Sequence, residues 1–165
     1  MASLQKIISH LWFDKQAEEA VQFYLSVFKN GKIRRKNYYG KEGKEIHGMP
    51  EGMVMTIEFE IEGQIFIALN GGPYFKFNEA VSFLISCDTQ EEIDYYWEKL
   101  SEGADKGAQQ CGWLKDKFGL SWQVIPSILP EMLGDANQEK SQRVVKSFLQ
   151  MKKMDIATLK RQFDK

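Results

Sequence analysis

Apolar and polar residues alternate with a period of two along residues 55–62, where every second position is Thr or Glu. This period is typical of a β-strand with one face in the core and the other in water. The next apolar stretch, residues 65–69, shows no alternation, which indicates a strand buried on both faces. Gly63 lies between the two stretches and can adopt the positive φ of a tight turn, so the pattern predicts a β-hairpin.

A second hairpin is predicted at residues 112–126, where Trp122 and Val124 are typical strand residues and Gly119 supplies the turn. The Lys-Asp-Lys sequence before this glycine is typical of an exposed turn. Each hairpin follows a helical pattern, over residues 14–28 and 88–100, and each helix follows a short β-rich segment, at residues 6–13 and 81–87. The repeated order of elements indicates a duplicated unit.

Both predicted helices begin near residues that can cap them. Asp14 is the expected cap of the first helix, and overlapping capping boxes that start at Asp88 and Thr89 are both available to the second. The spacing of apolar residues predicts the two buried faces. They consist of Ala17, Ala20, Val21, Tyr24 and Phe28 in the first helix, and of Ile93, Tyr96, Trp97 and Leu100 in the second.

Other segments complete the predicted fold. Residues 32–39 form a strand, and the glycine-rich residues 40–52 form a surface loop that carries His47 and is a candidate lid. Residues 103–110 form a loop or a short strand. Helices are expected after Pro126, over residues 127–133, about 138–151 and 155–163, with Asp155 as the N-cap of the last.

Composition narrows the classes of partner and compartment. The 165 residues carry 22 basic and 23 acidic side chains, a net charge of −1, so no general field attracts nucleic acid or an anionic membrane. No apolar run is long enough for a transmembrane helix or a signal peptide, and we expect a soluble, cytoplasmic protein. Cys87 and Cys111 are too few for a disulfide framework and are expected to be reduced thiols.

Several motifs together resemble one known family. They are Leu11-Trp-Phe-Asp14, Ala17-Glu-Glu-Ala20, Phe23-Tyr24, Asn70-Gly-Gly-Pro73, the hairpin at 112–126 and Met151-Lys-Lys-Met-Asp-Ile156. This set is similar to the PhnB-like branch of the vicinal-oxygen-chelate superfamily, which includes glyoxalase I, ring-cleaving dioxygenases and the bleomycin-resistance proteins. The resemblance implies an α+β fold of paired βαβββ modules, with curled mixed and antiparallel sheets around a cleft, and a homodimer. We expect this domain at residues 4–126, with modules at about 4–72 and 79–126, and a helical C-terminal extension at 127–165.

The resemblance also implies where a metal would bind. In metal-dependent relatives, two ligands come from the first strands of the modules and two from the last strands. Counted along this chain, the first-strand positions are Ile7 and Val81, with Ser9 as an alternative to Ile7. The last-strand positions are Ile67 and Gln123. A divalent metal needs three or four N, O or S ligands, and Gln123 alone does not provide them. We therefore expect no metal and no other cofactor.

The candidate binding residues are polar or aromatic residues close to the expected cleft. They are Ser9, Trp12, Asn70, Ser121, Trp122 and Gln123. Alternation along the strands favours Ser9, Ser121 and Gln123 as cleft-facing, and it places His10 between sheet and helix. No catalytic residue is assigned, and the candidates for an acid, base or nucleophile are His10, His47 and Cys111.

The expected function is the binding of a small organic molecule in the cleft, without a metal. The alternatives are an enzyme of the superfamily, with lyase, dioxygenase or group-transfer chemistry, and a purely structural dimer. Members of the branch are often labelled 3-demethylubiquinone-9 3-methyltransferases. A doubly wound methyltransferase has a glycine-rich loop after its first strand, whereas residues 12–16 contain no glycine, so methyl transfer is not expected.

Overall fold

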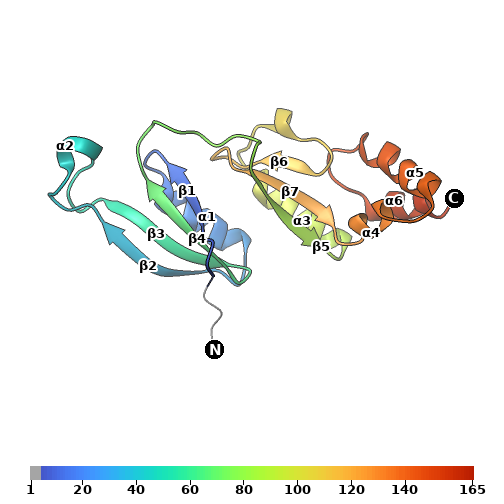
Figure 1. Ribbon diagram of the computed structural model, residues 1–165, viewed down its shortest axis with the longest axis horizontal. Coiled ribbons are helices and arrows are strands. Elements are labelled where there is room, and N and C mark those ends of the chain that lie inside the picture. Colours follow the sequence, from blue (N-terminus) through green and yellow to red (C-terminus); the bar gives the residue numbers. More distant parts are fainter. Residues whose placement is uncertain (1–4) are drawn as a thin grey trace. The chain divides into compact units, whose positions relative to one another are not determined.

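The computed structural model describes residues 5–165 (Figure 1). The chain forms two compact units, one ending at Lys76 and the other running from Phe77 to Lys165. Leu4, the expected start of the domain, lies outside the described residues. Helices and strands are mixed in both units, which confirms the α+β class.

The first unit has the predicted βαβββ order. Its elements are β1 (Ser9–Phe13), α1 (Ala17–Val27), β2 (Lys32–Tyr38), α2 (Lys44–His47), β3 (Val54–Ile61) and β4 (Gln64–Asn70). The four strands form one sheet in the order β1-β4-β3-β2. β1 runs parallel to β4, and the other two pairings are antiparallel. The short helix α2 lies in the predicted surface loop.

Helix α1 covers one face of this sheet. All five residues predicted for its buried face are buried, and the Tyr24 ring stacks on Phe59 of β3 with centroids 6.2 Å apart. The predicted alternation in β3 is also confirmed, because Ile57, Phe59 and Ile61 are buried and the Glu residues between them are partly exposed. The core of the first unit therefore lies between α1 and this sheet.

The start of α1 differs from the prediction. Its N-cap is Gln16, which makes no side-chain capping bond, so Asp14 is not the cap. The first helical N–H, that of Ala17, instead donates to Asn70 Oδ1 at 2.9 Å. Asn70 is at the end of β4, and a long-range contact therefore replaces the local cap.

The second unit contains one strand fewer than a βαβββ module. Its elements are β5 (Ser82–Cys87), α3 (Gln90–Leu100), the 3₁₀ helix η1 (Lys106–Ala108), β6 (Trp113–Lys115) and β7 (Ser121–Pro126). The strand order is β5-β7-β6, with β5 parallel to β7 and β6 antiparallel to it. Residues 103–110 contain η1 and an isolated bridge from Gln110 to Trp113 in place of a strand, so the second module is βαββ.

Helix α3 begins as one of the two expected capping boxes predicts. Thr89 is the N-cap, and its side chain accepts a hydrogen bond from the Glu92 N–H while the Glu92 side chain accepts from the Thr89 N–H. Two orphan donors of the first turn are satisfied in this way. Ile93, Trp97 and Leu100 are buried as predicted, whereas Tyr96 is half-buried.

The β6–β7 hairpin is held by a buried carboxylate. Gly119 has φ of 88°, as the turn requires. Asp116 is only 3% exposed, and its Oδ1 accepts from the Phe118 and Leu120 N–H groups at 2.9 and 3.1 Å. Its Oδ2 accepts from Trp122 Nε1 at 2.9 Å. Asp116 is therefore a structural residue of the hairpin rather than the exposed turn residue that its neighbours suggested.

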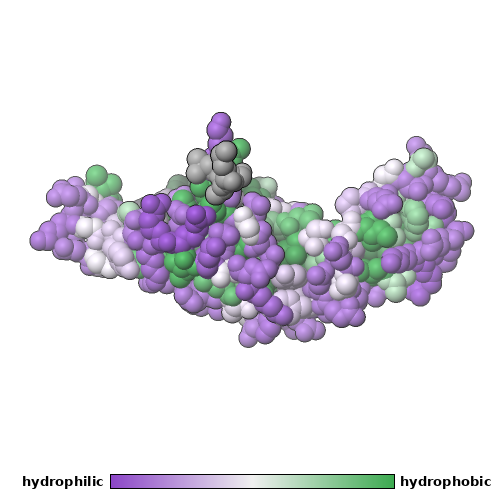
Figure 2. All heavy atoms as spheres, turned by 90° about the horizontal axis from the view of Figure 1, so that it is seen from below, coloured by the Kyte–Doolittle hydropathy of each residue, from purple (hydrophilic) through white to green (hydrophobic). Residues whose placement is uncertain are grey.

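The C-terminal segment is helical, as predicted, with α4 (Leu129–Leu133), α5 (Gln138–Phe148) and α6 (Ile156–Phe163). Asp155 caps α6 by accepting from the Thr158 N–H at 2.6 Å. The α5–α6 connection is tied to the rest of the unit, because the Cys111 and Gly112 N–H groups each donate to its carbonyls at 2.8 Å. Figure 2 shows a largely hydrophilic surface over these helices, as expected for a solvated helix face.

Candidate functional site

Each sheet has one face that its helix does not cover, and we call this the helix-free face. In the first sheet, the pairing register places two rows of side chains on it that span all four strands. One row runs from His10 through Ile67 and Glu58 to Arg35. A neighbouring row runs through Trp12, Leu69, Thr56 and Asn37. The face thus combines an apolar centre on β4 with polar groups on both sides.

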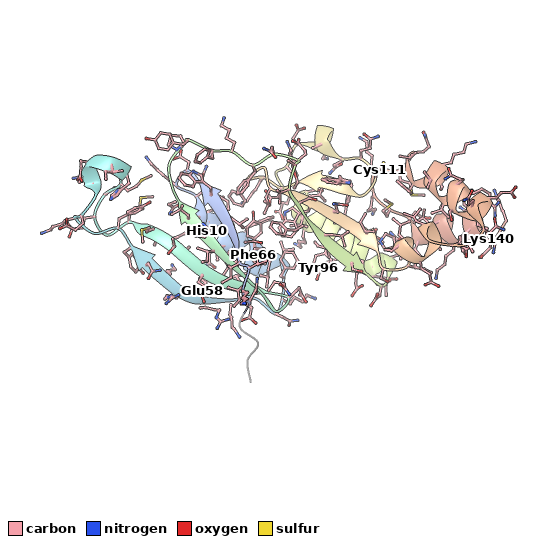
Figure 3. The ribbon with its side chains drawn as sticks, in the orientation of Figure 1. His10, Glu58, Phe66, Tyr96, Cys111 and Lys140 are labelled. Atoms are coloured by element: carbon pink, nitrogen blue, oxygen red, sulfur yellow. The ribbon has the colours of Figure 1, made fainter. Side chains whose placement is uncertain are left out.

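His10 and Ser9 occupy faces opposite to those expected. Ser9 shares its parity with Leu11 and Phe13, which are buried beneath α1, and therefore lies on the helix side of the sheet. His10 is exposed and lies on the helix-free face, opposite Ile67 (Figure 3). The expected position of His10 between sheet and helix is therefore wrong.

Trp12 lies on the helix-free face next to the glycine linker after β4. Its Nε1 donates to the Gly72 carbonyl at 2.8 Å, and its ring meets Phe75 edge-on at 4.9 Å. A Cβ at Gly71 would lie 2.4 Å from the Trp12 ring, so the linker can pass this close only as glycine. Trp12 is thus half-buried by its own linker.

The acidic residues of β3 are neutralised by basic residues of β2. Glu58 pairs with Arg35 at 2.8 Å and with Arg34 at 3.4 Å, and Glu60 pairs with Arg34 and Lys32 at 3.5 and 3.6 Å. These partly exposed ion pairs mark a hydrated edge of the sheet. Glu58 and Glu60 are therefore not a carboxylate pair for acid–base chemistry.

The second sheet brings together two of the predicted binding residues, Ser121 and Gln123. The register places Ser82, Ser121 and Lys115 in one row of its helix-free face, and Leu84, Gln123 and Trp113 in the next. Gln123 Nε2 donates to Ser82 Oγ at 2.8 Å, which joins the two rows. Ser121 is 1% exposed, and its Oγ has no hydrogen-bond partner among the described residues.

Trp122 points to the other side of the same strand. It is 3% exposed, its ring lies 5.7 Å from Phe83, and its Nε1 is bonded to Asp116. Asn70 is also enclosed, at 1% exposure. Besides accepting from Ala17, its Nδ2 donates to the Val54 carbonyl at 2.9 Å. In this structure both residues are fully engaged in holding the fold.

The remaining catalytic candidates lie apart from these faces. His47 is in α2, where Nδ1 accepts from the Met49 N–H at 3.0 Å and Nε2 is 3.2 Å from the Glu42 carbonyl. Because Nδ1 accepts, Nε2 carries the proton, and both ring nitrogens are occupied. Cys111 has a positive φ of 52° and joins the hairpin to the C-terminal segment. Burial raises the pKa of the other thiol, Cys87, to about 12, so it is a poor nucleophile.

Sequence reasoning missed Ser82 and Lys115. Both flank Ser121 across the sheet, and both are polar residues on strands. Counting outward from the Gly119 turn pairs Lys115 with Ser121, so the position of Lys115 beside Ser121 could have been predicted from the hairpin. The Ser82 pairing depends on parallel strands that lie far apart in sequence, and no local signal gives it.

The residues present do not fit the metal site that the superfamily implies. The pairing puts His10 beside Ile67 and Leu84 beside Gln123, whereas counting along the chain selected Ile7 and Val81. Only His10 and Gln123 of the four paired positions could ligate a cation, and a divalent ion needs at least three protein ligands in most sites. Among residues 5–165, no group of three His, Cys, Asp or Glu side chains is placed to hold a metal.

The fold defines the class of protein. The chain contains a βαβββ module and a related βαββ module. In each module the first and last strands pair in parallel, which is the arrangement expected from the resemblance to the vicinal-oxygen-chelate superfamily. A family profile described as 3-demethylubiquinone-9 3-methyltransferase matches residues 5–125. The chain belongs to this PhnB-like family.

Solved structures agree with this assignment. A PhnB protein from Bacillus cereus is 33% identical, with a TM-score of 0.63 over 74% of this chain and 99% of its own. A protein from Pseudomonas aeruginosa is 20% identical, with a TM-score of 0.58 over 75% and 98% of the two chains. The fosfomycin resistance protein FosX from Listeria monocytogenes is 16% identical, with a TM-score of 0.55 over 82% and 100%. The last two similarities concern the fold alone.

A comparison with curated proteins found no match. Within residues 5–165, no helix has both the length and the apolar character that crossing a membrane requires.

Proposed function

We propose that this protein binds a small organic molecule on the helix-free faces of its sheets, and that this binding needs no metal. The observation that carries the proposal is the composition of the helix-free face of the second sheet. It places the polar groups of Ser121 and Gln123 beside the apolar surfaces of Trp113 and Leu84. Ligand sites typically combine a mainly apolar lining with a few fixed polar groups.

The proposed ligand-binding residues have distinct roles. On the second sheet, Gln123 and Ser121 would provide hydrogen bonds. On the first sheet, taken by itself, Trp12 would provide an aromatic surface. Ser9, Asn70 and Trp122 lie on the helix side or in the core, so we propose that they act indirectly by holding the strands. Methyl transfer is not part of this proposal, because neither sheet in the described residues is doubly wound and parallel.

One observation favours a second candidate function, a metal-independent enzyme of the same superfamily. His10 is exposed on the helix-free face and has no hydrogen-bond partner among the described residues, so its imidazole is free to act as a general base. His47 is less suited to this role because both of its ring nitrogens are already engaged, and Cys111 lies in the turn before β6 rather than on a helix-free face. Loss of a reaction in His10→Gln, with ligand binding kept, would support the enzyme.

We also propose a cytoplasmic homodimer that does not bind nucleic acid. Within residues 5–165 the outer strands β1 and β5 each pair with a single strand, and the large apolar residues near them, Ile7 and Val81, are 88% and 66% exposed. Exposed edges of this kind are commonly covered by another chain. The two free thiols support the cytoplasmic location. The balanced charge supports the absence of nucleic-acid binding.

A thermal-shift screen of small organic molecules tests the proposal. A ligand at a hundred times its Kd stabilises the folded state by about 2.7 kcal/mol, which raises the melting temperature measurably. We expect hits whose effect is reduced in Gln123→Ala and unchanged in the control Gln109→Ala, whose amide lies on the η1 loop and bonds Ser101. Hits that stabilise the wild type and Gln123→Ala equally would place the site elsewhere, and the absence of any hit would contradict binding.

A further inference from the structure

Ser121 is a buried hydroxyl without a partner, which is unusual inside a folded protein. The side chain is 1% exposed, and its register places it on the helix-free face of the second sheet. Burying a hydroxyl without a hydrogen bond is unfavourable, so such groups in native structures call for an explanation. A ligand group that bonds to Ser121 Oγ when it binds would provide that explanation.

The residue directly opposite Ser121 on β6 is a lysine. Residues that face each other in an antiparallel pair have Cβ atoms about 4.5–5.5 Å apart, so Lys115 and Ser121 point to the same side as close neighbours. Lys115 Nζ forms an ion pair with Glu79, which lies in the exposed turn before β5. The Lys115 ammonium holds the pKa of the Glu79 carboxyl below its usual range.

The Lys115–Glu79 pair can be exchanged for a ligand. The Glu79 side chain is 62% exposed and belongs to no helix or strand, and ion pairs of this kind contribute little stability. An incoming carboxylate would replace Glu79 on Lys115, and the released Glu79 side chain, already 62% exposed, would be solvated by water. Glu79 thus shows that Lys115, the cross-strand neighbour of Ser121, already accepts a carboxylate as its partner.

Gln123 completes the arrangement. Its position pairs with Leu84, yet its amide reaches back along the strand to Ser82, the residue paired with Ser121. Gln123 and Lys115, two long polar side chains on the same face, are therefore the neighbours of Ser121 along β7 and across to β6.

We propose that the ligand of this face is a small carboxylic acid, whose carboxylate takes the place of Glu79 on Lys115 and accepts a hydrogen bond from Ser121. This inference rests on the proposed function and adds the chemical class of the ligand. Apolar parts of the same molecule would lie along Trp113 and Leu84 in the adjoining row.

The test is a titration of the full chain with benzoate, and neutral benzamide is the matched probe. Binding is monitored by NMR through the backbone amide signals of β5, β6 and β7. We expect benzoate to bind, and to bind more tightly than benzamide. Lys115→Met and Ser121→Ala should each weaken benzoate binding by about tenfold or more, because each removes a bond to a charged group. Glu79→Gln should strengthen it by roughly two- to fivefold, because it removes the competing carboxylate.

The control is Lys153→Met, which breaks a similar half-exposed ion pair with Asp94 elsewhere in the same unit. This variant should bind benzoate as the wild type does. Ser121→Ala should also be as stable as the wild type, because it removes an unpaired buried hydroxyl, so a loss of binding is not a loss of folding.

Opposite outcomes separate this inference from the proposed function. The carboxylic acid class is contradicted if Lys115→Met and Ser121→Ala bind benzoate like the wild type, or if Glu79→Gln binds it less well. It is also contradicted if benzamide binds and benzoate does not, although small-molecule binding at this face would then stand. If neither probe nor any molecule of the wider screen binds, both ideas are wrong.

Discussion

Replacing Asp116 with Asn tests how the β6–β7 hairpin is held. The carboxylate is almost fully enclosed, and three donors point at it, two from the turn backbone and one from the Trp122 indole. An asparagine oxygen can still accept from the two backbone groups. Its NH₂ group then faces the Trp122 N–H, so two donors meet and one buried bond is lost.

The expected cost follows from these contacts. A buried hydrogen bond to a charged acceptor contributes about 1.5–3 kcal/mol, so Asp116→Asn should lower the free energy of unfolding by about 2–3 kcal/mol. Asp116→Ala removes all three bonds and should cost about 3–5 kcal/mol. In urea, with a slope of about 2 kcal/mol/M, the asparagine variant should unfold at a midpoint roughly 1 M lower.

Urea unfolding followed by far-ultraviolet circular dichroism measures this effect, and Trp122→Phe isolates the indole bond. With phenylalanine at position 122, the further cost of Asp116→Asn should shrink, which gives a coupling energy of about 1–2 kcal/mol between the two sites. Equal midpoints for wild type and Asp116→Asn would refute this account of the hairpin. Strict additivity of the two substitutions would refute the indole bond.

Other substitutions test the remaining contacts by the same unfolding measurement. Asn70→Ala leaves two buried backbone groups without partners and should cost about 2–4 kcal/mol, and an unchanged midpoint would show that water replaces the amide. Gly112→Ala, at φ of 81° with its Cβ 2.6 Å from Ile125 Cδ1, should cost about 1–3 kcal/mol or more. The Cys87 thiol should resist a thiol reagent at pH 8 until the protein unfolds, because burial raises its pKa to about 12. The pKa of the Cys87 thiol in the folded state lies above the unfolded value of about 8.5. The stability that the neutral thiol contributes is therefore present at neutral pH and is lost as the pH rises from about 8.5 towards 12. This loss of stability should be smaller in Cys87→Ala.

Local patterns predicted the elements that local chemistry determines. The alternation in residues 55–62, the turn glycines at 63 and 119, and the Thr89 capping box all act within a few residues, and the structure confirms each of them. Asp116 shows where this approach fails. It lies in a Lys-Asp-Lys run that is typical of an exposed turn, and its burial depends on a tryptophan of the opposite strand.

The candidate site was harder to predict because parallel register is not encoded in local spacing. Counting along the chain selected Ile7 and Val81 as first-strand positions, whereas the β1–β4 and β5–β7 pairings select His10 and Leu84. A shift in register by an odd number of residues exchanges the two faces of a strand, and this explains why Ser9 and His10 were assigned to the wrong sides. In β7 the hairpin turn fixes the register, and Ser121 and Gln123 lie together on the helix-free face, while their contact with a ligand stays a prediction.

Calorimetric titration of the strongest screening hit into protein dialysed against EDTA tests most directly whether the protein binds a small molecule without a metal. The account predicts one binding event per chain, with the same Kd before and after dialysis and a much weaker Kd in Gln123→Ala. Binding that disappears after dialysis and returns when one equivalent of a divalent cation is added would contradict the account and would identify a metal-dependent member of the superfamily.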